Sequence, residues 1–237
     1  MTKGLFITGT DTDVGKTAVA VTILQQWVSQ QIDCRAYKPV ASGVQSSPSD
    51  IDRLWCASGN AGMRDDVCPQ AFQLPVAPEQ AAAAEGRQVD DALLRQGLCP
   101  HMHADVVLIE GAGGLFSPLS HQTLNADLAR DFQIPVVIVD SSRLGAIGRT
   151  LTTVTAAESV GLTVSAVVLS QSESGHHGET QKPESPEVIA RQSRAELQRR
   201  LPHIVVCGLG YDASTIEPFV EWQAIASQLS MPSKPQF

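Results

Sequence analysis

The chain has 237 residues, of which 43% are hydrophobic, and it carries a formal net charge of −8. This length and composition suit a single α/β domain over residues 1–237 with a buried core, or at most two small domains. The acidic balance, with no Lys/Arg cluster in the sequence, argues against nucleic acid as a partner. No stretch of the sequence is long and apolar enough to span a bilayer, and the first residues do not resemble a secretion signal.

The cysteines indicate the redox environment in which the chain works. There are five of them, which is an odd number, and they are scattered without a Cys-x-x-Cys pair. Such spacing does not suit a disulfide framework and favours a reducing compartment. We therefore expect a cytoplasmic protein that does not associate with a membrane.

Predicted strands and helices alternate along the chain. Short β-branched runs, typical of buried parallel strands, occupy residues 5–8, 35–38, 106–110, 136–140, 164–170 and 204–207. Apolar residues at helical spacing occupy 18–30, 124–132, 150–160, 188–201 and 218–229, and a short alanine run lies at 81–84. This alternation predicts a doubly wound, mainly parallel sheet with helices on both faces. We expect a mobile loop over 171–186 and a frayed tail over 231–237.

A phosphate-binding pattern follows the first predicted strand. Residues 9–17 read Gly-Thr-Asp-Thr-Asp-Val-Gly-Lys-Thr, so that a glycine-bounded turn leads into an apolar helix, as in P-loop NTPases. Backbone N–H groups of such a turn point at phosphate oxygens, and the helix N-terminus favours negative charge. Lys16 can reach the outer phosphates, and Thr17 can ligate the accompanying Mg²⁺. Five residues separate Gly9 from Gly15, one more than in the usual pattern. A purely structural turn would not need both Lys16 and Thr17.

A second segment lies at the edge of the predicted sheet where ligands gather in doubly wound folds. Tyr-Lys-Pro-Val-Ala-Ser-Gly at residues 37–43 follows the second predicted strand. Its lysine, Lys38, can stabilise a developing anion, and its serine, Ser42, can hydrogen-bond a substrate. Taken alone, Lys38 is better explained as a lysine that ends a strand in solvent.

A third segment supplies an acid at the same edge. Glu110 ends an apolar run and is followed by Gly-Ala-Gly-Gly. An acid there can act on Mg²⁺, and the glycines let the backbone approach a ligand, although a plain tight turn is the alternative. Asp50 is a further candidate oxygen donor. However, Ser49 and Asp50 also read as the start of a helix, and Asp52 is a rival.

Together these segments resemble those of the dethiobiotin synthetase family. The matching pieces are residues 9–17, 37–43, 107–114, 116–119 and 143–147, in the family's order and spacing. The resemblance therefore covers residues 4–170. Its most specific part is the segment at 37–43, because other P-loop synthetases share the phosphate loop and the Glu-Gly pair but are not expected to carry that segment.

The resemblance implies an ATP-dependent ligase of biotin biosynthesis. In this family, an amine of 7,8-diaminononanoate captures CO₂ as a carbamate, and the carbamate oxygen attacks the γ-phosphate of ATP. The second amine then attacks the mixed anhydride, expels phosphate and closes the cyclic urea of dethiobiotin. Because no enzyme nucleophile is required, catalysis is expected to rest on positioning and charge neutralisation.

The resemblance also implies roles for individual residues. Lys16, Lys38 and Thr12 are expected to act at the reacting groups. Asp50, with Thr17 and Glu110, is expected to hold Mg²⁺. Residues expected to contact ATP are Asp13, Val14, Gly15, Lys16, Thr17, Ala18, Glu110, Gly111, Ala112, Gly113, Ser170, Gln171, Gly208, Leu209 and Gly210.

Substrate recognition is expected to involve two regions. Ser42 would position the diamine end, and backbone N–H groups at Leu144 and Gly145, at a predicted helix N-terminus, would bind the substrate carboxylate. In the family the neighbouring subunit makes this carboxylate contact, so the resemblance implies a homodimer with shared sites. The expected small-molecule partners are 7,8-diaminononanoate, CO₂ and ATP.

The chain departs from the family pattern where the nucleotide base would bind. Family members commonly have Asn-Asp where this chain has Ser170 and Gln171, and a proline in the later turn that is Gly-Leu-Gly at 208–210 here. Neither change touches the phosphate chemistry. We therefore hypothesise weak discrimination between nucleoside triphosphates.

Two other classes of P-loop protein are alternatives to this one. A related P-loop amido-ligase would usually carry an amidotransferase domain with a Cys-His pair, for which this chain has no room. A nucleotide-switched partition ATPase would carry a second lysine near the start of the phosphate loop, where this chain has Thr10 and Asp11. Both readings are therefore less favoured than the synthetase.

Overall fold

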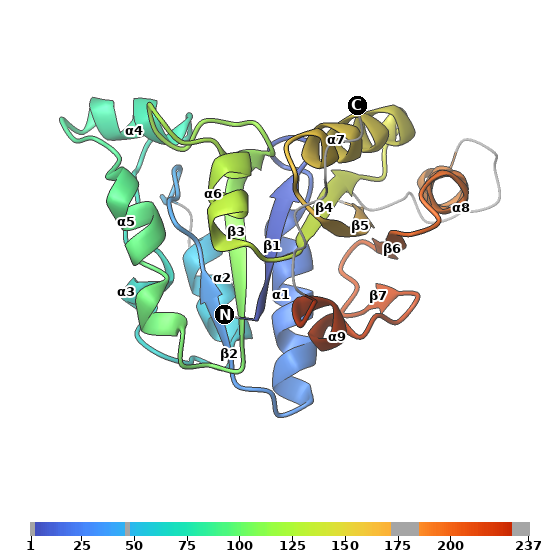
Figure 1. The fold of residues 1–237 in the computed structure, drawn as a ribbon, viewed down its shortest axis with the longest axis horizontal. Coiled ribbons are helices and arrows are strands. Elements are labelled where there is room, and N and C mark those ends of the chain that lie inside the picture. Colours follow the sequence, from blue (N-terminus) through green and yellow to red (C-terminus); the bar gives the residue numbers. More distant parts are fainter. Residues whose placement is uncertain (1–2, 46–47, 172–184, 229–237) are drawn as a thin grey trace.

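The computed structural model describes residues 3–45, 48–171 and 185–228 and contains a seven-stranded sheet with helices on both faces (Figure 1). The strand order is β2-β3-β1-β4-β5-β6-β7, and only the last pair is antiparallel. The strands are β1 (Gly4–Gly9), β2 (Cys34–Tyr37), β3 (Val106–Gly114), β4 (Val136–Ser141), β5 (Val164–Ser170), β6 (Val205–Leu209) and β7 (Ile216–Glu217). The predicted doubly wound, mainly parallel sheet is confirmed.

All but one of the described helices lie in the connections between these strands, and the last helix follows the last strand. They are α1 (Lys16–Ser29), α2 (Asp50–Ala57), α3 (Arg64–Val67), α4 (Pro78–Ala84), α5 (Asp91–Gln96), α6 (Asn125–Phe132), α7 (Ala146–Ser159), α8 (Pro186–Arg200) and α9 (Trp222–Ala226), with a 3₁₀ turn η1 (Cys99–His101). The alanine run that indicated helix lies within α4.

Alternate residues of the strands pack into two separate cores. In β1, Leu5 and Ile7 join one buried cluster with α1, α2 and α9, whereas Phe6 joins the other with α4 to α8. All three side chains are fully buried. Because both faces of a parallel sheet are covered in this way, its strands read in the sequence as continuous apolar runs.

The order of the strands fixes where a ligand can bind. β1 lies at the middle of the sheet, between β3 and β4, while the chain passes from β1 to β2 on one side and from β3 to β4 on the other. The direction of winding therefore reverses around β1 and β3. In open α/β sheets such a reversal leaves a crevice beyond the carboxyl ends of the strands, where ligands bind.

The long connection between β2 and β3 builds a wall beside that crevice. It contains α2, which packs beside α1 on one face of the sheet, and α3, α4 and α5, which Figure 1 shows beyond the β2 edge. Backbone hydrogen bonds tie its strand-like stretches together, from Lys38 N to Val67 O (2.7 Å), Ala41 N to Gln70 O (2.9 Å) and Gly43 N to Leu74 O (3.1 Å). The segment after β2 is thereby held close to residues about 30 positions later.

Several boundaries differ from the sequence prediction. β3 continues through the glycines to Gly114, although the apolar run predicted its end at residue 110. Glycine lowers strand propensity, but here the flanking strand β1 pairs with β3 at both ends, Gly4 with Val107 and Gly9 with Gly114. The helix predicted over 150–160 begins earlier, at Ala146, because Gly145 provides the left-handed turn that starts it.

The helix predicted over 218–229 was largely wrong. The chain forms the short antiparallel strand β7 at Ile216–Glu217, and α9 begins only at Trp222. Pro218 has no N–H to donate, and the apolar residues that suggested a longer helix, such as Val220, pack into the α1 side of the core without being helical. Residues 172–184 of the predicted loop, and the predicted tail at 231–237, lie outside the described residues.

In the part of the chain that the structure describes, no helix has the length and apolarity needed to cross a membrane.

We expect Trp27 to be a main contributor to stability. It lies in α1, is fully buried, and its indole N–H has no partner among the described residues. Trp27→Ala should lower the free energy of unfolding by about 3–5 kcal/mol in urea denaturation, because it leaves a large cavity. Trp27→Phe removes the unpartnered N–H and should cost less. Val28→Ala, at the neighbouring 40% exposed position, is the control and should change stability little.

Candidate active site

The phosphate loop joins the end of β1 to the start of α1. Gly15 precedes the helix at φ 94°, in the left-handed region that favours glycine, and Asp13 has a φ of 54°. A Cβ on Gly15 would overlap the side chain of Ser170 at the end of β5. Within the described residues, no side chain caps the first turn of α1. Its N–H groups are therefore available to an anion.

Lys16 folds back over the loop that it follows. Its Nζ donates to the Asp11 carbonyl at 2.8 Å, and the residue is 8% exposed. Burial and the nearby Lys38 charge lower the pKa of Lys16, and the carboxylate of Glu110 only partly offsets them. A bound polyanion would favour the charged form of this side chain.

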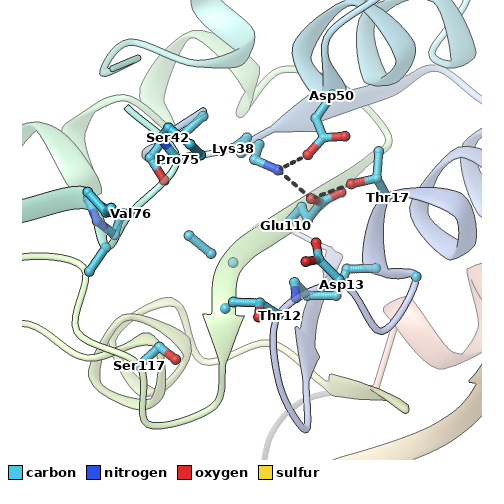
Figure 2. Close-up of a pocket in the computed structure, with 18 of the residues that line it drawn as sticks. Thr12, Asp13, Thr17, Lys38, Ser42, Asp50, Pro75, Val76, Glu110 and Ser117 are labelled. Atoms are coloured by element: carbon cyan, nitrogen blue, oxygen red, sulfur yellow. Dashed lines mark hydrogen bonds and ion pairs between the residues drawn. The ribbon is translucent and has the colours of Figure 1, made fainter. Parts of the chain in front are cut away.

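Four side chains from four elements meet at the carboxyl edge of the sheet (Figure 2). Lys38, directly after β2, donates to Glu110 Oε1 in β3 at 2.6 Å and to Asp50 Oδ2 at the start of α2 at 2.9 Å. Thr17 of α1 donates to the same Glu110 oxygen at 2.9 Å. Lys38 and Glu110 are 6% and 1% exposed. The lysine is therefore a buried partner of two carboxylates, and the alternative that it merely ends a strand in solvent is wrong.

The charges within this cluster stabilise one another. Burial acts to lower the pKa of Lys38, but the charges of Glu110 and Asp50 and the hydrogen bonds to both outweigh it, so that the pKa is raised above its usual value. Burial likewise acts to raise the pKa of Asp50, and the Lys38 ammonium with hydrogen bonds from Lys38 and Thr17 holds it below its usual value. Lys38 is thus cationic and Asp50 anionic at neutral pH.

The oxygens of the cluster suit a hard cation. Glu110 Oε2 is buried and has no hydrogen-bond partner among the described residues. A buried oxygen without a partner is a candidate ligand for a cation. Carboxylate and hydroxyl oxygens are the donors that Mg²⁺ accepts. Over residues 3–45, 48–171 and 185–228, no three His, Cys, Asp or Glu side chains gather as a metal site. The donor set here is therefore two carboxylates, Glu110 and Asp50, and the Thr17 hydroxyl.

The geometry distinguishes Asp50 from its neighbour Asp52. Asp52 forms a capping box with Ser49 and accepts a hydrogen bond from Arg64 Nε at 2.6 Å. These hydrogen bonds, from Arg64 first and then from Ser49, hold the pKa of Asp52 below its usual range. Asp52 caps the start of α2 and does not line the cavity described next, whereas Asp50 does.

A cavity of about 630 Å³ brings most of the expected site residues together. Of those residues it is lined by Thr12, Asp13, Gly15, Lys16, Thr17, Ala18, Lys38, Ser42, Asp50, Glu110, Gly111, Ala112 and Gly113. Val14, which was also expected to contact ATP, has its side chain buried in the core and does not line this cavity. The phosphate loop and Lys38 therefore share one space, although their segments lie far apart in the sequence.

Several lining residues were not found from the sequence. They are Arg53, Pro75, Val76, Ala77, Pro78, Ser117 and Pro118, with Ala41 from the segment after β2. Arg53 lies one helical turn after Asp50, with its guanidinium 4.0 Å from that carboxylate, so helical spacing offered a signal for it. Nothing local marks residues 75–78, which reach the site because the β2–β3 connection folds back over it.

Asn125 is another residue that the sequence did not single out. It is fully buried at the start of α6, and its Nδ2 donates to the carbonyls of Ala112 (2.5 Å) and Gly114 (2.8 Å). A Cβ on Gly111 would collide with its Oδ1. The glycines of β3 thus allow a close approach from α6, on the core side of the strand, as well as from the cavity.

The residues expected at the nucleotide base lie apart from the main cavity. Gln171, Gly208, Leu209 and Gly210 line a separate cavity of about 330 Å³, together with Glu187, Arg191 and Arg194 of α8. Ser170 is buried beside Gly15 and lines neither space. Both cavities open at the carboxyl ends of strands, one from β1 to β3 and the other at β5 and β6.

The turn expected to bind a carboxylate does not reach the main cavity. Gly145, at φ 90°, is the N-cap of α7, and Leu144 beside it is 85% exposed. Neither residue lines the space that holds Lys38 and Ser42. A single copy of the described chain therefore does not join this turn to the other expected substrate residues.

Comparisons with known proteins agree with this geometry. Residues 3–208 match a family described as an AAA domain. The chain is 39% identical to the ATP-dependent dethiobiotin synthetase of Anaeromyxobacter dehalogenans (strain 2CP-C), over 84% of this chain and 90% of the relative. It is 40% identical to the enzyme of the same name from Serratia marcescens, over 69% of this chain and 75% of the relative.

Solved structures show the same fold at low sequence identity. The signal recognition particle receptor FtsY from Elizabethkingia anophelis has a TM-score of 0.50 and 16% identity, and the alignment covers 95% of this chain. This chain spans 64% of the receptor chain, a little under two thirds. At such identity the likeness concerns the fold alone.

The parallel sheet and the loop before α1 define a P-loop nucleotide-binding protein. Within that class, the length and identity of the matches show that the chain belongs to the dethiobiotin synthetase family. This membership favours the synthetase reading over an amido-ligase or a partition ATPase.

The contact between Gly15 and Ser170 gives a test of the loop. An alanine in the left-handed conformation costs about 1–2 kcal/mol of folding free energy. Gly15→Ala should destabilise the fold by more than this, because the new methyl group also collides with Ser170. It should also weaken binding of an ATP analogue measured by calorimetry. Gly86→Ala is the matched control, since Gly86 has φ 67° and open space around its Cα. Equal effects of the two substitutions would contradict the assigned contact.

Proposed function

We propose that this chain is an ATP-dependent dethiobiotin synthetase. It would close the cyclic urea of dethiobiotin from 7,8-diaminononanoate and CO₂, with release of ADP and phosphate, in biotin biosynthesis. One observation carries the proposal. The buried Lys38, paired with Glu110 and Asp50, shares a single cavity with the phosphate loop. That arrangement provides a cation for a small anion beside a site for a triphosphate.

ATP is proposed to lie along the phosphate loop. The N–H groups at the start of α1 would bind the phosphates, and Lys16 would exchange its contact with the Asp11 carbonyl for one with the outer phosphates. The glycines of β3 permit close approach of the polyphosphate tail, since Gly113 is at φ 74°. The base is proposed to occupy the cavity beside Gln171 and 208–210.

Lys38 is proposed to stabilise the reacting carboxyl group. An ammonium group carries three N–H donors, and the contacts with Glu110 and Asp50 use two of them. The third is available to an anion in the cavity. The carbamate formed from CO₂ and one amine is such an anion, and its negative charge passes to the transferring phosphoryl group and to ADP as its oxygen attacks the γ-phosphate. Thr12, which lines the same cavity, would lie beside this centre.

Mg²⁺ fits the oxygen atoms of Thr17, Asp50 and Glu110 and would neutralise phosphate charge when bound. Glu110 Oε2, buried and without a described partner, supports this assignment. Thr17 holds its hydroxyl on Glu110, and Lys38 orients both carboxylates. These contacts hold the oxygens in fixed positions when no cation is bound.

Ring closure needs only positioning after phosphoryl transfer. The carbamate oxygen bonds to the γ-phosphorus while the bond to ADP breaks. The free amine then attacks the carbamoyl carbon, phosphate leaves, and the amine releases a proton. Ser42, at the cavity wall beside Pro75 and Val76, would hold the diamine end (Figure 2). The wall formed by the β2–β3 connection would keep competing water from the mixed anhydride.

A homodimer with shared sites is part of the proposal. The expected carboxylate-binding turn at Leu144 and Gly145 lies outside the main cavity of its own chain, and Leu144 is 85% exposed. A second copy would bring this turn to the tail of the substrate. We also propose a cytoplasmic enzyme, which is consistent with its five cysteines, all of them free thiols.

The direct test is product formation. The purified chain would be incubated with 7,8-diaminononanoate, bicarbonate, Mg²⁺ and ATP, and the product analysed by mass spectrometry. We expect a cyclic urea that carries the label of ¹³C-bicarbonate, together with ADP. ATP hydrolysis without a labelled urea would contradict the proposal.

Lys38→Ala should remove most of the turnover and leave ATP binding nearly intact. Its amino group faces the carboxylates and the cavity, whereas Lys16 lies over the phosphate loop. Lys16→Ala, the matched comparison, should weaken binding of ATP as well as lower the rate. Calorimetry with an ATP analogue and the urea assay would separate the two effects. Unchanged turnover in Lys38→Ala would refute the role assigned to that residue.

The base site predicts weak selectivity among nucleoside triphosphates. Gln171 is the described side chain that follows β5 at this cavity, and its Oε1 accepts from Tyr211 N at 3.3 Å. The surrounding guanidinium groups of Arg191 and Arg194 belong to long, adaptable side chains. Urea formation with ATP, GTP and CTP at matched concentrations should differ by less than about tenfold. Strict use of ATP would contradict this expectation.

A further inference from the structure

Outside the main cavity, one buried carboxylate accepts hydrogen bonds both from the start of the phosphate loop and from α7. Asp140, near the end of β4, is fully buried. Its Oδ1 accepts from Thr10 Oγ1 at 2.6 Å and from Arg149 Nε at 3.1 Å, and its Oδ2 accepts from Thr150 Oγ1 at 3.1 Å. Neither Asp140 nor Thr150 lines the cavities described above.

The donors come from two segments with different tasks. Thr10 is the residue that follows Gly9, so it starts the phosphate loop, and its N–H also binds the Val139 carbonyl at 2.9 Å. Arg149 and Thr150 lie in the first turns of α7. Through its other nitrogens, Arg149 donates to the carbonyls of Leu144 (3.2 Å) and Ser141 (3.2 Å).

We propose that Asp140 is a positioning residue for nucleotide binding, which fixes the start of the phosphate loop against α7. The proposal rests on the proposed ATP site but not on the identity of the second substrate. A buried carboxylate must keep hydrogen-bond donors, since losing them leaves a charge without compensation. Thr10 therefore has one favoured side-chain orientation, and the backbone of the loop begins from a fixed point.

This arrangement has a consequence at a distance. Thr150 lines neither of the two cavities described above, yet it donates to the second oxygen of the carboxylate that accepts from Thr10. When Thr150 is changed, the carboxylate can rotate toward Arg149, and the bond to Thr10 weakens. Nucleotide affinity should then fall although nothing near the nucleotide has been altered. When the Thr10 hydroxyl is absent, the same change at Thr150 should not lower the nucleotide affinity further, because Asp140 no longer bonds the Thr10 side chain.

The experiment measures the dissociation constant of a non-hydrolysable ATP analogue with Mg²⁺ by calorimetry. Thr10→Val and Thr150→Val each remove one hydroxyl and keep the shape. We expect affinity to fall about tenfold in the first and about threefold in the second, in line with hydrogen bonds to a charged group. The double variant should match Thr10→Val alone, because the two losses act through Asp140. Thr10→Ser, which keeps the hydroxyl, should restore most of the affinity.

Thr8→Val is the matched control. Thr8 lies two residues before Thr10 in β1, is fully buried, and its hydroxyl has no partner among the described residues. It undergoes the same chemical change, so it should leave the dissociation constant unchanged. A merely structural role of Asp140 would lower the urea midpoint of Thr10→Val and leave its affinity as in the unaltered chain.

Three results would overturn the proposal: unaltered affinity in Thr10→Val, unaltered affinity in Thr150→Val, or a double variant whose loss is the product of the two single losses. The measurement needs no diamine and no turnover. A chain that binds the analogue but makes no cyclic urea would therefore refute the proposed function and still decide the role of Asp140.

Discussion

The ion pair between Lys38 and Glu110 is the constraint on which the site depends. Two charges removed from water are stable only when their geometry is close to ideal, and removing one partner strands the other. The 2.6 Å contact therefore requires the end of β2 and the middle of β3 to stay adjacent, as neighbouring parallel strands. Thr17 and Asp50 complete the cluster and bring α1 and α2 with them. The same charges that suit the proposed chemistry thus also hold together the elements that carry them.

Asp140 also restrains the phosphate loop, through its hydrogen bond with Thr10. The main cluster faces the cavity, whereas Asp140 does not line it and accepts hydrogen bonds from two hydroxyls and one arginine. The phosphate loop is accordingly bounded by a carboxylate at each side of β1, Glu110 in β3 and Asp140 in β4. A loop of this length, one residue longer than the usual pattern, has more freedom to restrain.

The sequence was informative for most local or periodic signals, although the apolar spacing over 218–229 did not give the predicted helix. Buried parallel strands read as β-branched runs, and the Gly15-Lys16-Thr17 turn has one well-understood use, so the sheet and the phosphate loop followed directly. The choice between Asp50 and Asp52 could not be made, because both stand in the first turn of α2, and the tertiary partners Lys38 and Arg64 separate them. Asn125, Asp140 and residues 75–78 were missed for a similar reason. Each reaches the site through contacts between segments distant in sequence, which leave no trace in spacing or composition.

The wall at residues 75–78 belongs to a connection that pairs with the segment after β2 but contributes nothing to the phosphate loop. Under the proposed function this wall would contact the diamine, although the same connection also carries Asp50, a proposed Mg²⁺ ligand. Under the proposed function, exchanging a few residues of this wall would change the length of diamine that fits the cavity, while the phosphate loop and the carboxylates on either side of β1 stay as they are.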